Sequence, residues 1–465
     1  MTVDLSSTRS IHVVGVGGTG MSPIATVLAA MGHRVSGSDV KESPVIERLR
    51  ALGVHVDIGQ RPENLAPDLE LVTRSTAIPD ENAEVGEARR RNLPVLRRAE
   101  ALAAICALRR PIAVAGSHGK TTTSSMLALV LVEAGLRPSF IIGGELRRSG
   151  SNAVWSRPAD GDASGGWFVV EADESDGTFI ELGAEIAVVT SLEPDHLEYW
   201  GGWSALEAAF DQFLAEATGL KLVCADDPGA AAVGGRHGAV TYGTSEGATY
   251  RMLDLVGARA GVGFDLERRG EVLGRIELPV PGAHNARNAA AAAAIALEIG
   301  ASFDDVARAL ARYTGVARRF QFRGERDGVT FIDDYAHLPG EIRSMLTAAR
   351  QGGWGRVVCV FQPHRFSRMA TLDVSEFGDV FDEADVLVMT EIYAQGEAPR
   401  PGVSGKRVLE AVLDARPGRK AYWFPSRADL AANVKSVLRP GDLCLTLGAG
   451  DLTLLPGELL GDAPV

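Results

Sequence analysis

Cysteine, aromatic residues and long apolar runs are scarce in this chain of 465 residues, and each shortage excludes a class of protein. The four cysteines, Cys106, Cys224, Cys359 and Cys444, are widely scattered, so buried reduced thiols are expected rather than a disulfide framework or a cysteine-ligated metal. No uncharged apolar run approaches the ~18 residues that a membrane span requires. The N-terminus lacks the basic and apolar segments of a secretory signal. We therefore expect a cytoplasmic protein.

A surplus of positive charge is also missing. Lys and Arg number 47 against 60 Asp and Glu, which gives a net charge of −13, and no long basic stripe occurs. Nucleic acid is therefore not an expected partner, whereas small anions remain compatible with local arginines and loop amides. The apolar share of 46% and the charged share of 23% are typical of globular proteins, and the length predicts about three domains.

One stretch organises the rest of the chain: Pro111-Ile-Ala-Val-Ala-Gly-Ser-His-Gly-Lys-Thr-Thr-Thr-Ser-Ser125. Residues 111–115 suit a short buried strand, and residues 121–133 carry apolar side chains at helical spacing. Residues 116–122 would then lie between a strand and a helix N-terminus, where glycines let backbone N–H groups approach phosphate oxygens. Lys120 would add a positive charge, and the Thr121 hydroxyl could bind Mg²⁺. The usual pattern has a further glycine where Val114 stands, and the alternative is a glycine turn with a solvated lysine.

A second glycine loop lies near the N-terminus. Residues 11–16 suit a strand that enters Gly15-Val-Gly-Gly-Thr-Gly20, a helical pattern follows, and a strand over 33–38 ends at Asp39. This is the arrangement of a dinucleotide-binding βαβ unit, with its acidic residue in place. The loop could hold NAD, FAD or the diphosphate of a UDP-sugar, and a purely structural turn is the alternative. Further strands over 54–58, 69–73 and 93–96, with a helix over 83–91, complete an N-terminal α/β domain over residues 1–107.

Acidic side chains follow two later strands. A strand that begins at Trp167 runs into Glu171-Ala-Asp-Glu-Ser-Asp176, and a strand over 186–191 precedes Glu193, Asp195 and His196. Because ligands gather at the carboxyl ends of strands in α/β sheets, these side chains are expected to bind Mg²⁺ beside the phosphate loop. For His196, a partly exposed loop histidine is the alternative. Residues 156–166, rich in Gly, Asp and Ser, are expected to form an exposed loop.

The sequence from Pro281 onward predicts the end of a central domain and then another α/β domain. Pro281-Gly-Ala-His-Asn-Ala-Arg-Asn288 leads into a helix over 289–299, and Asn285 and Asn288 would either cap that helix or contact a nucleotide base. Ser302 is expected to cap a second helix, which closes a central ATP-binding domain over residues 108–314. Residues 315–465 contain expected strands over 329–332, 357–361, 386–390 and 443–447. The predicted fold is therefore α/β in three domains: N-terminal Rossmann-like, central P-loop ATPase-type and C-terminal Rossmann-like.

Taken together, these stretches resemble the Mur ligases of peptidoglycan synthesis and, within that family, the branch that joins L-alanine to UDP-N-acetylmuramate. The resemblance covers nearly the whole chain. Besides the two glycine loops and the acidic strand ends, it rests on these segments: Ser36-Gly-Ser-Asp39, Arg318-Arg-Phe320, Asp333-Asp-Tyr-Ala-His337 and Phe361-Gln-Pro-His-Arg-Phe-Ser-Arg368.

The resemblance implies a role for each matching residue. The UDP-sugar would be bound by Gly15, Gly17, Gly18, Gly20, Ser38 and Asp39. ATP would be bound by Gly116, Ser117, His118, Gly119, Lys120, Thr121, Thr122, Asn285, Arg319 and Asp334. Mg²⁺ would be bound by Thr121, Glu171 and His196, and the acceptor substrates by His337, Arg365 and Arg368. The residues implied to be catalytic are Lys120, His196, Arg319 and His337.

The chain departs from the family pattern at three positions. Ser117 replaces the usual threonine, while Leu338 and Gly340 stand where the alanine-adding ligases usually have a second histidine and a threonine. Ligases that add later residues often bind Mg²⁺ through a carbamylated lysine. Residues 196–219 contain no lysine, which favours the alanine-adding branch.

The implied activity is ATP-dependent amide formation through an acyl phosphate, with ATP and Mg²⁺ as cofactors and UDP-N-acetylmuramate and L-alanine as substrates. No membrane insertion is expected, and the chain would act as a monomer or homodimer. Three alternatives remain open. They are a recycling ligase that joins a tripeptide to UDP-N-acetylmuramate, an NAD-dependent oxidoreductase suggested by the first glycine loop alone, and a non-catalytic nucleotide-binding regulator suggested by Leu338 and Gly340.

Overall fold

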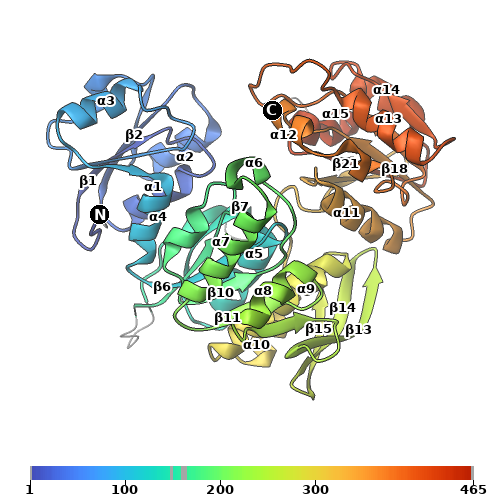
Figure 1. The fold of residues 1–465 in the computed structure, drawn as a ribbon, viewed down its shortest axis with the longest axis horizontal. Helices are drawn as coiled ribbons and strands as arrows, with labels where there is room; N and C mark the ends of the chain where they lie inside the picture. The colour runs from blue at the N-terminus through green and yellow to red at the C-terminus, as the bar shows by residue number, and fades with distance from the viewer. Residues whose placement is uncertain (1–2, 147–149, 159–164, 462–465) are drawn as a thin grey trace. The chain divides into compact units, whose positions relative to one another are not determined.

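The computed structural model describes residues 3–146, 150–158 and 165–461. Among these residues, three β-sheets follow one another along the chain, with five, ten and six strands, and they can be traced by colour from blue to red in Figure 1. By internal contacts the chain divides into two compact units. The first comprises Met1–Leu253, Leu266–Gly274 and Arg287–Leu310, and the second comprises Asp254–Asp265, Arg275–Ala286 and Ala311–Val465. The three sheets confirm the predicted three-domain α/β class, and the boundaries after residues 107 and 314 stay predictions.

The first sheet is parallel, with the strand order β3-β2-β1-β4-β5. Its strands are β1 (Ser10–Val14), β2 (Arg34–Asp39), β3 (His55–Ile58), β4 (Leu71–Arg74) and β5 (Val95–Arg97), and its helices are α1 (Ser22–Ala30), α2 (Pro44–Ala51), α3 (Ala83–Arg90) and α4 (Arg98–Cys106). The five strands and α3 confirm the predicted elements to within two residues at each end. Because the strand order reverses beside β1, the loop after β1 lies at the position where such sheets bind ligands.

The second sheet has the order β15-β14-β13-β12-β11-β10-β6-β9-β7-β8. Its strands are β6 (Arg110–Ala115), β7 (Ser139–Leu146), β8 (Ser151–Val154), β9 (Trp167–Glu171), β10 (Ile186–Val189), β11 (Lys221–Cys224), β12 (Val240–Gly243), β13 (Tyr250–Ala258), β14 (Gly261–Arg268) and β15 (Glu271–Leu278). Strand β6 pairs in parallel with both β9 and β10. The carboxyl ends of these three strands therefore meet at one edge of the sheet. Residues 159–164 of the predicted exposed loop lie outside the described residues.

Six helices of the described residues accompany this sheet, and the start of one of them differs from the sequence prediction. They are α5 (Lys120–Glu133), α6 (Leu197–Trp200), α7 (Trp203–Glu216), α8 (Pro228–Arg236), α9 (Ala283–Glu298) and α10 (Phe303–Leu310). Helix α9 begins at Ala283, so Asn285 and Asn288 lie within its first two turns and the cap interpretation is wrong. The cap at Ser302 is confirmed, because its hydroxyl accepts a hydrogen bond from the Asp305 N–H at 3.1 Å.

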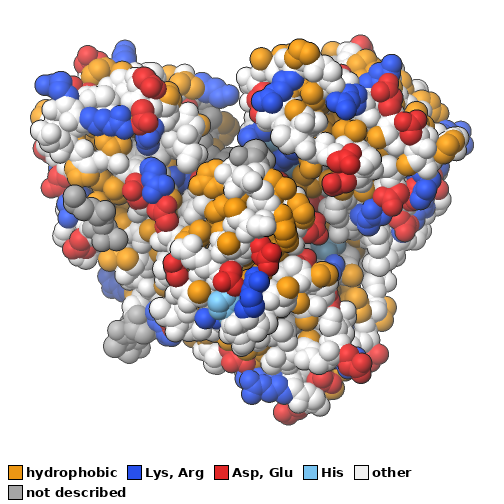
Figure 2. All heavy atoms as spheres, in the orientation of Figure 1, with side chains coloured by type: hydrophobic (Ala, Val, Ile, Leu, Met, Phe, Trp, Pro, Cys, Tyr) orange, Lys and Arg blue, Asp and Glu red, His pale blue; other side chains and the backbone are white. Residues whose placement is uncertain are grey.

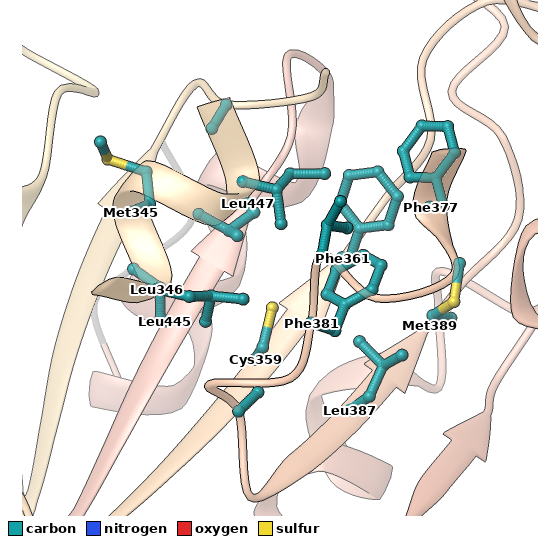
Figure 3. Close-up of a cluster of buried hydrophobic side chains, with 14 of the residues drawn as sticks. Met345, Leu346, Cys359, Phe361, Phe377, Phe381, Leu387, Met389, Leu445 and Leu447 are labelled. Carbon is teal, nitrogen blue, oxygen red and sulfur yellow. The ribbon is translucent and has the colours of Figure 1, made fainter. Parts of the chain in front are cut away.

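The third sheet has the order β16-β17-β21-β18-β19-β20, antiparallel only between β16 and β17. Its strands are β16 (Gln321–Arg326), β17 (Val329–Asp334), β18 (Arg356–Phe361), β19 (Val386–Met389), β20 (Ala421–Trp423) and β21 (Asp442–Leu447), with helices α11 (Pro339–Gln351), α12 (Phe366–Thr371), α13 (Gly405–Ala415), α14 (Leu430–Val437) and α15 (Leu455–Leu460). One face of the sheet packs an aromatic cluster, in which Phe361 lies 5.3 Å from Phe381 and 5.9 Å from Phe377 between ring centroids (Figure 3).

The structure shows where the cysteines and the charged side chains lie. All four cysteines are free and buried, as predicted. Acidic and basic side chains are interspersed over the face drawn in Figure 2. No helix among the described residues is both long and apolar enough to cross a membrane.

Candidate functional site

The phosphate loop connects β6 to α5, as the sequence predicts. Gly116 has a φ of 133°, and a Cβ there would lie 2.2 Å from Oγ1 of Thr190, so the position requires glycine. Gly119 has a φ of 83° and precedes the first residue of α5. The end of β10 fixes the loop, because the Ser117 N–H donates to the Ser191 carbonyl and the His118 N–H donates to the Ser191 hydroxyl. The first N–H groups of α5 lack intrahelical acceptors, an arrangement that suits an anion.

Lys120 lies inside this loop and is bound by an acidic side chain. Its Nζ donates to the Gly116 carbonyl at 2.6 Å and to Oε1 of Glu174 at 2.9 Å. Burial opposes the lysine charge, but Glu174 and Asp173 more than offset it and raise the pKa of Lys120 to about 12. Burial raises the pKa of Glu174, and Lys120 opposes that rise. The lysine is therefore charged at neutral pH.

Thr121 and Glu171 bring two oxygen ligands together. The Thr121 hydroxyl donates to Oε1 of Glu171 at 3.1 Å, and the other carboxylate oxygen accepts from the Gly143 N–H at 2.7 Å. The Glu171 side chain occupies the space that a Cβ on Gly143 would fill, with the nearest carboxylate oxygen 2.4 Å away. A hydroxyl and a carboxylate form an oxygen pair that suits Mg²⁺.

His196 belongs to a second group of side chains that could hold a metal ion. Atoms of Glu174, Asp195 and His196 lie within 4.8 Å of one another. His196 has a φ of 52° and directly precedes α6. That helix is fixed to the acidic segment after β9, because Tyr199 OH donates to the Asp176 carbonyl at 2.8 Å and Trp200 Nε1 donates to the Glu174 carbonyl at 3.0 Å. The structure thus brings the two predicted acidic strand ends together.

Three further polar side chains support the loop and the start of α5. The Ser117 hydroxyl donates to the Glu193 carbonyl at 3.2 Å and accepts from the Glu193 N–H at 2.9 Å. The His118 ring lies 3.0 Å from the Glu193 carboxylate. Asn288 on α9 accepts from the Thr123 hydroxyl at 3.2 Å. Sequence reasoning assigned Asn288 no definite role, because its contact with the loop crosses more than 160 residues.

The N-terminal glycine loop follows β1. The N–H groups of Gly15 and Val16 donate to the Ser38 carbonyl, and the Gly17 N–H donates to Oδ2 of Asp39 at 2.9 Å. Asp39 therefore fixes the loop through its carboxylate. The Ser38 hydroxyl is buried and donates to the Glu84 carboxylate at 2.5 Å, so Ser38 offers the loop its carbonyl.

Arg319 and Asp334 lie in the second compact unit. Asp334 is buried, and its carboxylate accepts from the N–H groups of Phe320 at 2.6 Å and Ala336 at 2.7 Å. Burial raises the pKa of Asp334 to about 7, although nearby Arg319 acts in the opposite direction. The Arg319 guanidinium lies 5.3 Å from the centroid of Tyr335. In the same unit, the Nδ2 group of Asn285 donates to the Pro281 carbonyl at 2.7 Å.

The predicted acceptor-binding residues all lie in the second unit, and two of them are in contact. Arg368 contacts Nε2 of His337, whose Nδ1 lies 3.1 Å from the Tyr335 carbonyl. Arg365 precedes α12, has a φ of 62° and donates through Nε to the Gln395 side chain at 2.7 Å.

The buried His364 is an additional member of this group, with its ring centroid 5.3 Å from that of His337. It stands inside the motif at 361–368, but no role was predicted for it. Of the departing residues, Leu338 is buried before α11 and its N–H donates to Glu341 at 3.1 Å.

The fold and the first unit's site define a nucleotide-binding α/β protein with a lysine-bearing phosphate loop. Three family models match successive segments: "Mur ligase family, catalytic domain" over residues 10–110, "Mur ligase middle domain" over 114–296 and "Mur ligase, glutamate ligase domain" over 318–450. The chain belongs to the Mur ligase family.

Individual relatives cover nearly the whole chain. It is 44% identical to the UDP-N-acetylmuramate–L-alanine ligase of an Anaeromyxobacter species, over 99% of both chains. It is 46% identical to the ligase of the same name from Acidothermus cellulolyticus, over 97% of this chain and 94% of the relative. Among solved structures, the UDP-N-acetylmuramate-alanine ligase of Thermotoga maritima superimposes with a TM-score of 0.81 at 28% identity, covering 97% of this chain and 98% of that one.

Proposed function

We propose that this chain joins L-alanine to UDP-N-acetylmuramate with ATP. The lactyl carboxylate of the sugar attacks the γ-phosphate and forms an acyl phosphate with release of ADP. The alanine amine then attacks the acyl carbon, phosphate leaves, and an amide remains. The observation that carries the proposal is the 44–46% identity, over nearly the full chain, to relatives named for this reaction.

Lys120 and the first N–H groups of α5 would bind the ATP phosphates. A charged lysine at the mouth of the loop offsets negative charge as the γ-phosphate moves, and the backbone amides do so without reorganising. Gly116, Ser117, His118, Gly119 and Thr122 shape this cradle. Asn285, Arg319 and Asp334 remain proposed ATP contacts.

Thr121 and Glu171 fit Mg²⁺ as an adjacent hydroxyl and carboxylate. His196 would reach a second ion from the neighbouring group with Glu174 and Asp195. Mg²⁺ bound at these residues would offset phosphate charge and fix the orientation of ATP.

The other substrates would bind at two further places. The glycine loop at 15–20, supported by Ser38 and Asp39, would bind the diphosphate of the sugar nucleotide. His337, Arg365 and Arg368 would bind the amino acid, whose carboxylate suits an arginine. The cytoplasmic location and the monomeric or homodimeric state stay predictions.

The test is phosphate release from ATP in the presence of UDP-N-acetylmuramate, with L-alanine, glycine, L-serine or the tripeptide added separately. Release with L-alanine, together with the alanylated product by mass spectrometry, is expected. Release only with the tripeptide would make the chain a recycling ligase. No release with any acceptor would favour a non-catalytic nucleotide-binding protein and draw attention to Leu338 and Gly340.

A further inference from the structure

Arg98 lies between the N-terminal glycine loop and the acidic segment after β9, both in the first compact unit. It is the first residue of α4, and its side chain is 18% exposed. One guanidinium nitrogen lies 3.4 Å from Oδ2 of Asp176, 3.6 Å from Oδ2 of Asp173 and 3.4 Å from the Thr178 hydroxyl. These distances exceed the ~2.8 Å of a tight charge-assisted hydrogen bond. The acidic side chains therefore orient the guanidinium but leave its N–H groups able to donate stronger hydrogen bonds to a ligand.

The N-terminal glycine loop has open donors only at its far end. The N–H groups of residues 15–18 all bond acceptors of the chain itself: the Ser38 carbonyl, the Asp39 carboxylate and the Gly15 carbonyl. Among the described residues, no acceptor contacts the N–H groups of Thr19 and Gly20. An anion bound by this loop would therefore meet Thr19 and Gly20, next to the start of α1.

Arg98 lies directly against that open end. A Cβ on Gly20 would lie 3.0 Å from Cδ of Arg98 and 3.3 Å from its Nη1. The absence of a side chain at Gly20 thus allows the guanidinium to approach the backbone beside the open N–H groups. A planar cation next to two amides suits a group with several negatively charged oxygens.

We propose that Arg98 binds the diphosphate of the sugar nucleotide together with the N–H groups of Thr19 and Gly20. Asp173 and Asp176 hold the guanidinium in place. This inference rests on the proposed function, which supplies the sugar nucleotide. A purely structural tie between α4 and the segment after β9 is the competing explanation.

The neighbouring Arg97 provides a matched control for that explanation. It belongs to the same region, and its guanidinium lies 3.0 Å from Glu181 of η2 (Thr178–Leu182), but its side chain is 53% exposed. No contact of Arg97 with the glycine loop occurs among the described residues. Loss of either arginine removes an ion pair to the segment after β9, and only loss of Arg98 removes a cation beside Gly20.

The experiment is calorimetric titration of the full chain with UDP-N-acetylmuramate for the wild type, Arg98→Ala, Arg98→Lys and Arg97→Ala. Affinity is expected to fall about tenfold or more in Arg98→Ala, to recover in part in Arg98→Lys and to change less than about twofold in Arg97→Ala. ATP affinity, measured in parallel, should change less than about threefold in all variants, because Lys120 and α5 stay intact.

Two results would overturn the inference: unchanged affinity in Arg98→Ala, or an equal loss in Arg97→Ala. If Arg98→Ala does not fold, Arg98→Lys provides the test, because lysine keeps the positive charge but lacks the planar guanidinium. Wild-type affinity in Arg98→Lys would then count against the diphosphate contact. The proposed function is judged separately by alanine ligation in the wild type. An active wild type with an unaffected Arg98→Ala variant would reject only the role of Arg98.

Discussion

The ammonium of Lys120 lies 2.8 Å from Oε2 of Glu174, and the Glu174 side chain is only 2% exposed. A buried carboxylate is costly unless a cation accompanies it, so the two residues stabilise each other's charged forms. Glu174 therefore gives Lys120 a defined position at the mouth of the phosphate loop. Variants of this pair can distinguish two roles of Lys120: its positive charge beside the phosphates and its contribution to the stability of the fold.

Replacement of Lys120 by Met should reduce kcat by about a thousandfold or more, because a phosphate-binding cation is lost. The variant should also lose about 3 kcal/mol of unfolding free energy, because Glu174 is left buried without a partner. In the double variant Lys120→Met/Glu174→Gln, stability should return and activity should not. Turnover and urea unfolding measure the two effects. Normal turnover in Lys120→Met would remove the residue from the mechanism.

Gly116→Ala should destabilise the phosphate loop more than a glycine replacement elsewhere. The φ of 133° is unfavourable for alanine, and the new methyl group would meet the Thr190 hydroxyl at 2.2 Å. Gly135→Ala is the control, because its φ is 74° but nothing lies within 4 Å of the added carbon. We expect a loss of about 1 kcal/mol in the control and at least twice that in Gly116→Ala, measured by denaturant unfolding. Equal losses would show that the loop can move away from Thr190.

Asp39→Ala should weaken UDP-N-acetylmuramate binding by about tenfold, because the Gly17 N–H loses its acceptor and the loop loses its fixed shape. The Asp39 carboxylate also accepts from the Val40 N–H at 2.7 Å. Asp57→Ala, on the neighbouring strand β3, removes a carboxylate that contacts His55 at 3.4 Å and serves as the control. Titration calorimetry gives both affinities. If Asp39→Ala binds like the wild type, Asp39 is only a structural acid.

His364 should make the stability of the chain depend on pH. Burial, followed by the neighbouring His337, Arg368 and Arg365, lowers the pKa of His364 to about 3. An unfolded histidine has a pKa of about 6.5, so the unfolded chain binds more protons between these values. Its contribution to stability is therefore present above about pH 6.5 and is lost as the pH falls toward 3.

The measurement is urea unfolding at about pH 7 and about pH 5. We expect wild type to lose about 2 kcal/mol more than His364→Gln over this interval, since the glutamine does not titrate. His55→Gln is the control, because the His55 side chain is 75% exposed. Identical pH dependence in wild type and His364→Gln would show that the imidazole titrates in the folded chain as it does in the unfolded chain.

The sequence could predict the elements because their signals are local. Apolar periodicity located β6 and α5 to within one residue, and the glycines at 116 and 119 indicated the turn between them. The helix α9 shows the limit: its start at Ala283 rather than after Asn288 was missed, because a polar segment such as 284–288 has no clear apolar face in sequence. The carboxyl-end rule for parallel strands also correctly brought the acidic segments after β9 and β10 to one edge.

The sequence by itself therefore determined the order of strands and helices, the two glycine loops and the family, since each depends on residue types at short spacing. Tertiary structure alone decided which distant side chains meet. It placed Glu174 against Lys120, Asn288 against Thr123, and Arg98 against Gly20. It also buried Asp334 between backbone N–H groups and raised its pKa to about 7. Contacts of this kind depend on sheet order and burial, which no local pattern of residues specifies.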